Sequence, residues 1–414
     1  MSNKIAIIGG GAAGLVAAIS AKYADNNCDV TVFDRLDRVG KKILATGNGC
    51  CNLTNINAGL TVDDTNGQAF PVHYFGKNAD FALPALKSFS VENTISFFEN
   101  LGVLTRLDED KYYPYSLQAG TVLDALRFEC ERLCVKFRLG VSVDKIGAQN
   151  GKFSISGDKF DCCIVAAGGK SSPHLGSDGS GYKLLEAFGH KCSPLLPAIT
   201  QIKTETDFVK QLKGIKIDAD VTISVDNKNV RTEFGQVLFA DYGLSGPPVF
   251  QLSGIAAYNY NKNCLIKLNL MPEYDFNSLL QLVTAASKRN STCENMLSDI
   301  LNKRLGQVVI KAAGYPLSTA TSQLKPTDLK NIVNTIKQFS FKVTGVQGFA
   351  NAQVTAGGIY TNDFDSATMQ SKLIRNLYAA GEVLDIYGDC GGYNLQWAFS
   401  SGYIAGKSAA TRTV

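Results

Sequence analysis

The segment from Lys4 to Gly14 reads KIAIIGGGAAG, and it decides the fold. Its β-branched first half predicts a strand, and the alanine-rich run Leu15–Ala21 predicts a helix directly after the glycines. In such a strand–turn–helix unit, Gly9 permits the tight turn, Gly11 lets a pyrophosphate approach the backbone, and Gly14 lets the helix pack close to the strand. The phosphates would face the free N–H groups at the start of the helix.

A second predicted strand, Val30–Phe33, runs into Asp34, about 20 residues beyond the last glycine, where an acid accepts hydrogen bonds from a ribose. The carboxylate would repel a 2′-phosphate, which disfavours NADP at this site. NAD and FAD remain open, because both contain the pyrophosphate and adenosine that this unit recognises. A glycine motif alone is often only a tight turn, but the flanking strands, helix and acid favour a dinucleotide site.

Bulk properties exclude several classes of protein. The chain has 414 residues, enough for two or three domains, and a net charge of +4 from 41 basic and 37 acidic residues. Basic residues form no cluster, so no nucleic-acid partner is expected. The 11 cysteines include the adjacent pairs Cys50-Cys51 and Cys162-Cys163, which suits a reducing compartment. With no leader and no apolar run of about 20 residues, we expect a cytoplasmic protein without a membrane span.

Three later segments predict further parts of a cofactor site. Lys41–Asn55 is rich in Gly and Asn and reads as an ordered polar loop, although an ordinary surface loop is the alternative. Two apolar strands end in glycines, at Gly168-Gly169 and at Gly381-Glu382. A small-residue helix is expected over residues 395–406, and its partially positive N-terminus would stabilise an anionic reduced flavin. Without the N-terminal unit, a buried glycine-rich helix start would be the preferred interpretation.

The whole chain resembles the bacterial FAD-dependent oxidoreductases of the aminoacetone-oxidase type, a family with bile-acid-reductase-like members. The segments that carry the resemblance are Lys41–Asn55, Ser177–Tyr182, Gly243–Pro247, Thr355–Gly358 and Gly381–Trp397. The resemblance implies FAD as the cofactor. One departure is notable, because Gly49-Cys50-Cys51-Asn52 stands where relatives commonly read Gly-Arg-Cys-Asn, so a charge expected near the flavin is missing.

The resemblance also implies which residues contact FAD. The pyrophosphate would lie against Gly9, Gly11, Ala12, Ala13 and Gly14, and the adenosine against Asp34, Arg35 and the backbone of Val143, with Ala166, Ala167 and Gly168 nearby. The ribityl chain and flavin would follow Lys42, Thr46, Gly47, Asn48, Gly49, Cys51 and Asn52. The site would be closed by Gly381, Glu382, Asp385, Gly392, Tyr393, Asn394, Leu395 and Gln396.

The middle of the chain predicts an insertion. Short alternating stretches over residues 193–272 favour antiparallel strands, and helical spacing over residues 273–340 includes the apolar stripe Leu329, Ile332, Val333 and Ile336. We therefore expect an α/β fold: a Rossmann-type FAD-binding domain with a parallel sheet (1–192 and 350–414), an inserted β-rich domain (193–272 and 341–349) and a small helical subdomain (273–340). The insertion would cover the flavin and define a substrate cavity.

The expected chemistry is hydride transfer through flavin N5. None of the three histidines has a neighbour at metal-ligand spacing, so no metal is expected, and no catalytic acid is named. A second glycine motif is missing, so NAD(P)H would dock only transiently. The leading hypothesis is NAD(P)H-dependent reduction of an unsaturated small organic substrate. The alternatives are an O₂-dependent oxidase of a small amine, a flavin-dependent RNA-modifying protein and a noncatalytic flavin redox sensor. The oligomeric state stays open.

Overall fold

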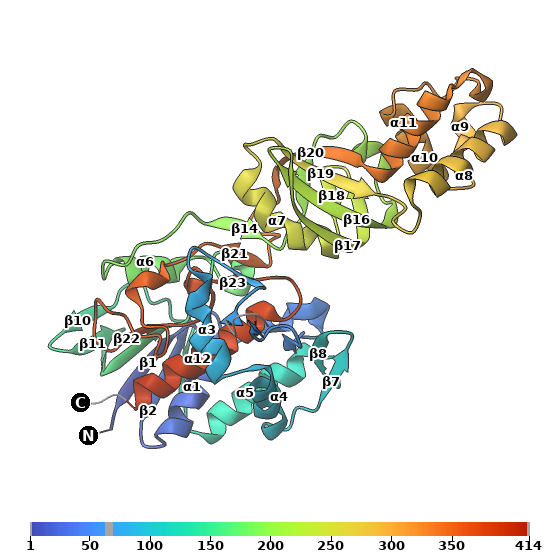
Figure 1. Ribbon diagram of the computed structural model, residues 1–414. Coiled ribbons are helices and arrows are strands. Elements are labelled where there is room, and N and C mark those ends of the chain that lie inside the picture. Colours follow the sequence, from blue (N-terminus) through green and yellow to red (C-terminus); the bar gives the residue numbers. More distant parts are fainter. Residues whose placement is uncertain (1, 63–68, 412–414) are drawn as a thin grey trace. The chain divides into compact units, whose positions relative to one another are not determined.

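The computed structural model describes residues 2–62 and 69–411. The chain forms two compact units, of which the first combines Met1–Leu196 with Gln353–Val414 and the second is Pro197–Ala352. Each unit has its own hydrophobic core. The predicted fold class is confirmed, because a Rossmann-like parallel sheet and a separate β-barrel with helices are both present (Figure 1).

A parallel five-stranded sheet forms the centre of the first unit. Every neighbouring pair in it is parallel, in the order β22-β13-β1-β2-β9. The strands β1, β13 and β22 are buried on both faces, as in parallel sheets covered by helices on each side, whereas the edge strand β9 is largely exposed. The strands are β1 (Lys4–Ile8), β2 (Asp29–Asp34), β9 (Lys136–Leu139), β13 (Cys162–Val165) and β22 (Leu377–Ala379).

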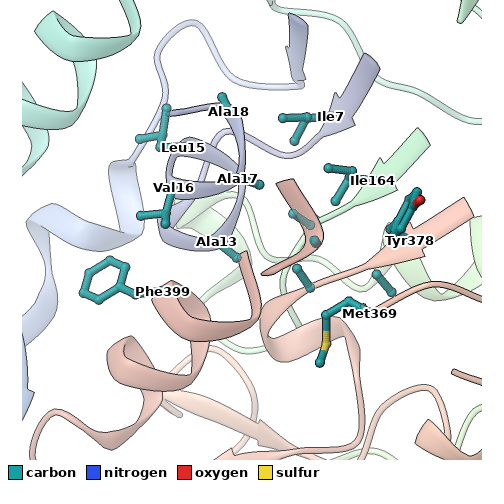
Figure 2. Packing of buried hydrophobic residues seen from close by; sticks show 14 of the residues in the cluster. Ile7, Ala13, Leu15, Val16, Ala17, Ala18, Ile164, Met369, Tyr378 and Phe399 are labelled. Carbon is teal, nitrogen blue, oxygen red and sulfur yellow. The ribbon is translucent and has the colours of Figure 1, made fainter. Parts of the chain in front are cut away.

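Two helices from opposite ends of the chain, α1 (Ala12–Ala24) and α12 (Tyr393–Ala410), pack closely against each other beside this sheet. Their contact uses small residues, since a Cβ on Gly402 would lie 2.3 Å from the carbonyl oxygen of Ala13. Figure 2 shows Val16 of α1 and Phe399 of α12 in the same apolar cluster as Ile164 of β13. The other helices of this unit are α2 (Lys41–Leu44), α3 (Leu83–Ser88), α4 (Val91–Asn100), α5 (Ala119–Arg132) and α6 (Ser180–Glu186).

Short antiparallel sheets complete the first unit. Their strand orders are β3-β8-β7, β10-β11-β12, β4-β5 and β23-β6. Their bounds are β3 (Thr54–Asn55), β4 (Thr61–Val62), β5 (Ala69–Phe70), β6 (Tyr74–Phe75), β7 (Thr105–Asp108), β8 (Lys111–Pro114), β10 (Gly147–Gln149), β11 (Lys152–Ile155), β12 (Asp158–Phe160) and β23 (Tyr387–Gly388). The remaining short strands are β14 (Leu196–Ala198) and β21 (Val354–Ala356).

The second unit is a closed barrel with a group of helices. The barrel order is β15-β18-β17-β16-β19-β20, and alternation along β16 buries Ala219, Val221 and Ile223 completely. The barrel strands are β15 (Ile202–Thr204), β16 (Lys216–Val225), β17 (Lys228–Ala240), β18 (Gly243–Ser245), β19 (Cys264–Asn269) and β20 (Phe339–Val346). The helices are α7 (Pro247–Asn259), α8 (Phe276–Arg289), α9 (Cys293–Met296), α10 (Lys303–Ala312) and α11 (Pro326–Lys337).

The apolar stripe of α11 is buried, as predicted. Cys130 is buried in α5, which ends at Arg132, and Cys134 follows the helix, exposed and with a left-handed φ of 56°. The short return into β9 forces this turn, because the next strand of the sheet begins at Lys136.

Over residues 2–62 and 69–411, no helix is long and apolar enough to cross a membrane.

Candidate functional site

The glycine turn has the geometry of a dinucleotide-binding loop. Gly9 has a φ of 104°, and a Cβ there would lie 2.4 Å from the carbonyl oxygen of Ala166 on the neighbouring strand. A Cβ on Gly14 would lie 1.9 Å from the carbonyl oxygen of Gly9. Gly11 is the N-cap of α1 and has no side-chain cap, and no described atom lies within 4 Å of where its Cβ would be. Backbone atoms therefore fill the Cβ positions of Gly9 and Gly14, whereas the space at the Cβ position of Gly11 is open.

Asp34, at the end of β2, is bound to this loop. Its Oδ2 accepts a hydrogen bond from the Gly10 N–H at 2.8 Å, and its Oδ1 accepts one from the Leu36 N–H at 2.8 Å. Burial raises the pKa of the carboxyl, against the opposing effect of these N–H donors. Each oxygen retains a second acceptor position for a ribose hydroxyl. The next residue, Arg35, forms an ion pair with Asp178.

The loop after α2 has an unusual backbone. Gly47 and Asn48 both adopt left-handed conformations, with φ of 55° and 53°, and Cys51 does so with φ of 56°. The Cys51 N–H donates to the Thr46 carbonyl at 3.0 Å, which closes the turn, and the position of a Gly49 Cβ is open within 4 Å of the described atoms. A succession of this kind exposes backbone N–H groups to a ligand.

An ion pair joins this N-terminal region to the C-terminal segment. Lys42 Nζ lies 2.9 Å from Glu382 Oε2, although 340 residues separate the two in the chain. The other oxygen of Glu382 accepts a hydrogen bond from the Thr355 N–H at 2.7 Å. Thr355 Oγ1 in turn accepts from the Lys170 N–H at 2.8 Å. This network fixes the ends of β13, β21 and β22 relative to the loop that follows the second strand.

The expected middle residues lie at the same edge of the sheet. The Ala166 N–H donates to the Ile8 carbonyl at 2.8 Å, and Ala167 and Gly168 continue the chain past the end of β13. Gly168 has a φ of 74°, and a Cβ there would lie 2.9 Å from Ser177 Oγ. Val143 is buried just beyond β9, and the N–H of Val141 donates to the Asp34 carbonyl at 3.0 Å. This segment therefore follows the end of β2.

The C-terminal residues approach the glycine turn from the other side. The Gly381 N–H donates to Ser401 Oγ at 2.9 Å, and a Cβ on Gly381 would lie 2.9 Å from the Cβ of Ala13. The buried carboxyl of Asp385 accepts from the Lys77 N–H at 3.3 Å through Oδ2, and burial raises its pKa.

The first turn of α12 adds the remaining expected residues. Gly392 is the N-cap, with a φ of 102°, and Tyr393 is the first helical residue, while Leu395 is half-buried against the core. Asn394 donates from Nδ2 to the carbonyls of Gly388 and Asp389, which holds the preceding loop. Gln396 is turned inward, since Nε2 donates to Phe89 O at 3.0 Å and Oε1 accepts from Thr54 at 2.7 Å. Through these two buried hydrogen bonds, Gln396 fixes the start of α12 relative to Thr54 and Phe89.

These residues form a site that fits FAD. The open space above Gly11 lies at the N-terminus of α1, where a pyrophosphate is favoured. Asn52 is buried, and its Oδ1 has no hydrogen-bond partner among the described residues, so it can accept from a ligand. The open position at Gly49 lies in the same loop. An extended ligand with a phosphate at one end and hydrogen-bond donors at the other suits this arrangement.

The Cys51 thiol of this loop is buried and is not activated as a thiolate. Burial raises the pKa of the Cys51 thiol to about 12, so it stays protonated at neutral pH. Cys50 and Cys51 form no disulfide. Within residues 2–62 and 69–411, no group of three or more His, Cys, Asp or Glu side chains is placed to hold a metal ion.

Sequence motifs reveal only some of the residues that position the site. Thr355 and Ser401 each bind the backbone of a predicted site segment through a single hydroxyl. Lys77 donates its N–H to Asp385 from a segment outside the motifs, and the preceding Gly76, with a φ of 148°, packs directly against the Asp385 carbonyl. Thr355 lies in a segment that carries the family resemblance, so that segment was the available clue to it.

Comparison with known proteins identifies the family. The model of the HI0933-like protein Rossmann domain matches residues 3–408. A 3-dehydro-bile acid delta(4,6)-reductase from Clostridium scindens is 37% identical over 418 residues, covering 99% of this chain and 100% of the relative. Ribosomal RNA dihydrouridine synthases from Haemophilus influenzae and Escherichia coli are each 30% identical, and each alignment covers 97% of this chain.

The family match spans nearly the whole chain, from β1 to the last turns of α12, and therefore includes both ends of the site described above. The resemblance drawn from the glycine turn and the later motifs is confirmed. The chain belongs to the HI0933-like family of FAD-binding Rossmann proteins.

Proposed function

We propose that this flavin-dependent oxidoreductase uses NAD(P)H to reduce an activated carbon–carbon double bond in a small organic substrate. The observation that carries the proposal is the end-to-end match, at 37% identity, with a reductase whose name places its action at the delta(4,6) positions of a 3-dehydro-bile acid. A conjugated cyclic ketone is accordingly the substrate class that we propose first.

The two helix N-termini would hold two different parts of FAD, the pyrophosphate and the flavin. The N-terminus of α1 at Gly11 would bind the pyrophosphate, and Asp34 would accept from the ribose while it keeps the Gly10 N–H in place. The N-terminus of α12 at Gly392 would lie against the flavin, where its partial positive charge stabilises negative charge on the ring. Bound FAD would supply a hydride acceptor and donor at N5.

The protein side chains would position the cofactor and exclude other chemistry. The Lys42–Glu382 ion pair holds the Gly- and Asn-rich loop against the C-terminal segment, and Asn52 would donate or accept along the ribityl chain. A thiolate mechanism is disfavoured because the Cys51 thiol stays protonated at neutral pH. Redox chemistry would therefore depend on FAD, with NAD(P)H docking transiently as the electron donor.

The proposal is tested in two steps. Purified holoprotein is mixed anaerobically with NADH or NADPH, and bleaching of the flavin absorption is followed by stopped flow. The reduced protein is then mixed separately with conjugated 3-keto steroids, with conjugated 3-keto bile acids, with the imine formed by oxidation of a small primary amine, and with O₂. The masses of the products are measured. We expect either NADH or NADPH to bleach the flavin absorption. A conjugated ketone should then restore the absorption, and the ketone itself should gain two hydrogen atoms. If neither nicotinamide reduces the flavin, the proposed function is wrong.

A ribosomal RNA substrate is the second candidate, favoured by two relatives that match 97% of the chain. Unmodified ribosomal RNA is therefore included among the acceptors, and dihydrouridine in digested RNA is measured by mass spectrometry. A chain specific for conjugated ketones would leave the RNA unchanged. Flavin reduction followed by reoxidation with O₂ alone would indicate the redox-sensor or oxidase alternative.

A further inference from the structure

His73 and Asp389 form a hydrogen-bonded pair next to the first turn of α12, and neither belongs to the cofactor contacts expected from the sequence. His73 Nδ1 lies 3.0 Å from Asp389 Oδ2. The Asp389 side chain is 3% exposed, whereas that of His73 is 31% exposed. The carboxylate is thus buried while part of the imidazole stays accessible.

The backbone fixes this pair from both sides. Strands β6 and β23 pair antiparallel with Tyr74 opposite Gly388, which places His73 opposite Asp389. The N–H of Asp389 donates to the carbonyl of His73 at 2.9 Å. On the other side, Asn394 Nδ2 donates to the Asp389 carbonyl at 3.1 Å. The His73–Asp389 geometry is therefore set by the strand pairing and by hydrogen bonds to both backbone carbonyls, and not by the contact between the two side chains alone.

The imidazole also packs against the end of the helix that we propose to face the flavin. The rings of His73 and Tyr393 have centroids 4.6 Å apart and planes inclined by 34°. The ring of Tyr74 packs edge-on against Tyr393 from a further side. The titratable groups that face His73 from the elements packed around it are Asp389 and Tyr393, with Tyr74 behind Tyr393.

A buried carboxylate bonded to one ring nitrogen has a defined consequence. An ionised carboxylate only accepts hydrogen bonds, so Nδ1 carries a proton and donates it to Asp389. The carboxylate fixes the orientation of the ring. When the imidazole is cationic, both ring nitrogens carry a proton and Nε2 is a donor as well. Nε2 is then a positioned proton donor on the side of the ring away from Asp389.

We infer that His73 is the proton donor in the reduction of the double bond and that Asp389 is its positioning residue; this inference rests on the proposed function. Saturation of an activated double bond needs a hydride on one carbon and a proton on the other. The hydride comes from FAD that NAD(P)H has reduced, so the substrate gains two electrons and the cofactor loses them. The proton comes from His73: the Nε2–H bond breaks, a C–H bond forms at the second carbon, and the neutral imidazole regains a proton from water.

The two half-reactions separate this role from a structural one. In His73→Asn holoprotein, the rate of flavin reduction by NAD(P)H should match the wild type within about twofold. The same should hold for reoxidation by ferricyanide, because ferricyanide accepts electrons without protonation of a carbon atom. Reoxidation by the conjugated ketone should slow by about 10²-fold or more, the usual contribution of general acid catalysis. Asp389→Asn should slow the same step by a smaller factor. His174→Asn, at an exposed histidine, is the matched control and should change nothing. An unaltered rate with the ketone in His73→Asn overturns the inference.

A second measurement does not depend on the substrate. Diethyl pyrocarbonate modifies accessible imidazoles, and mass spectrometry locates the product. Bound FAD should protect His73 several-fold relative to the apoprotein, while His174 should react equally in both forms. Equal modification of His73 with and without FAD overturns the inference. If FAD protects His73 but the wild type reduces no unsaturated ketone, the substrate class of the proposed function has failed and the location of the proton donor has not.

Discussion

At the scale of single residues, the glycines of the first turn have separable roles. A Cβ at Gly11 meets no described atom within 4 Å, and its φ of −83° suits any residue. Gly11→Val should therefore fold normally and fill the space proposed for the pyrophosphate. We expect the apoprotein Tm to stay within about 2 °C of the wild type, since surface changes cost within about 0.5 kcal/mol, while FAD binding measured by flavin absorbance is lost.

The matched variant is Gly14→Ala, whose new methyl carbon would lie 1.9 Å from the Gly9 carbonyl oxygen. That contact involves backbone on both sides, so we expect the apoprotein itself to lose about 1–3 kcal/mol of stability. A Gly11→Val protein that retains FAD, or a Gly14→Ala apoprotein as stable as the wild type, would contradict the assignment of these two roles.

His190 gives the first unit a pH-dependent contribution to stability. Its ring is buried, stacks on Phe364 and bonds Ser371 through Nε2 at 3.0 Å, and burial lowers the pKa of the imidazole. The unfolded chain binds a proton below about pH 6.5 while the folded chain resists it, so stability falls as the pH drops below that value. Urea titrations between pH 7.5 and 5.5 should show this loss in the wild type. His190→Gln should show a smaller loss, and parallel curves for the two proteins would disprove the assignment.

At the scale of elements, the close approach of α1 and α12 is the contact that holds together the two helix ends that we propose to bind FAD. A Cβ on Gly406 would lie 2.1 Å from the Ala17 carbonyl oxygen. Gly406→Val should push the helices apart, costing about 3 kcal/mol or more and weakening FAD binding at the same time. Lys407→Ala, on the exposed face of the same helix, is the control. Equal Tm values and FAD affinities for Gly406→Val and the wild type would show that this contact is not limiting.

Elements with strong local signals could be predicted, and elements created by distant pairing could not. β1, the glycine turn and α1 follow from one short segment with a known spacing, and the stripe of α11 follows from helical periodicity. By contrast, His73 and Asp389 lie 316 residues apart and meet because β6 and β23, of two residues each, pair with each other. A strand of two residues carries no periodicity. Similarly, the inward orientation of Gln396 depends on Phe89 and Thr54, which no spacing within α12 reveals.

At the scale of the whole molecule, two separate cores imply two unfolding events. The chain has a single tryptophan, Trp397, which is buried in α12 of the first unit and donates from Nε1 to the Gly381 carbonyl at 3.2 Å. Its emission wavelength therefore reports on the FAD-binding unit alone, whereas far-ultraviolet circular dichroism reports on both units.

FAD should stabilise only the unit that binds it, by about 2.7 kcal/mol when free FAD is at 100 times its Kd. On heating with increasing FAD, we expect the Trp397 transition to move to higher temperature, because ligand binding to the folded state alone draws the equilibrium toward that state. The circular dichroism curve should contain this moving component and a second that FAD does not shift, which belongs to residues 197–352. Trp397 emission maxima are used because the flavin quenches intensity. A single transition that both probes report, and that FAD moves as a whole, would mean that the two cores unfold cooperatively despite their separation.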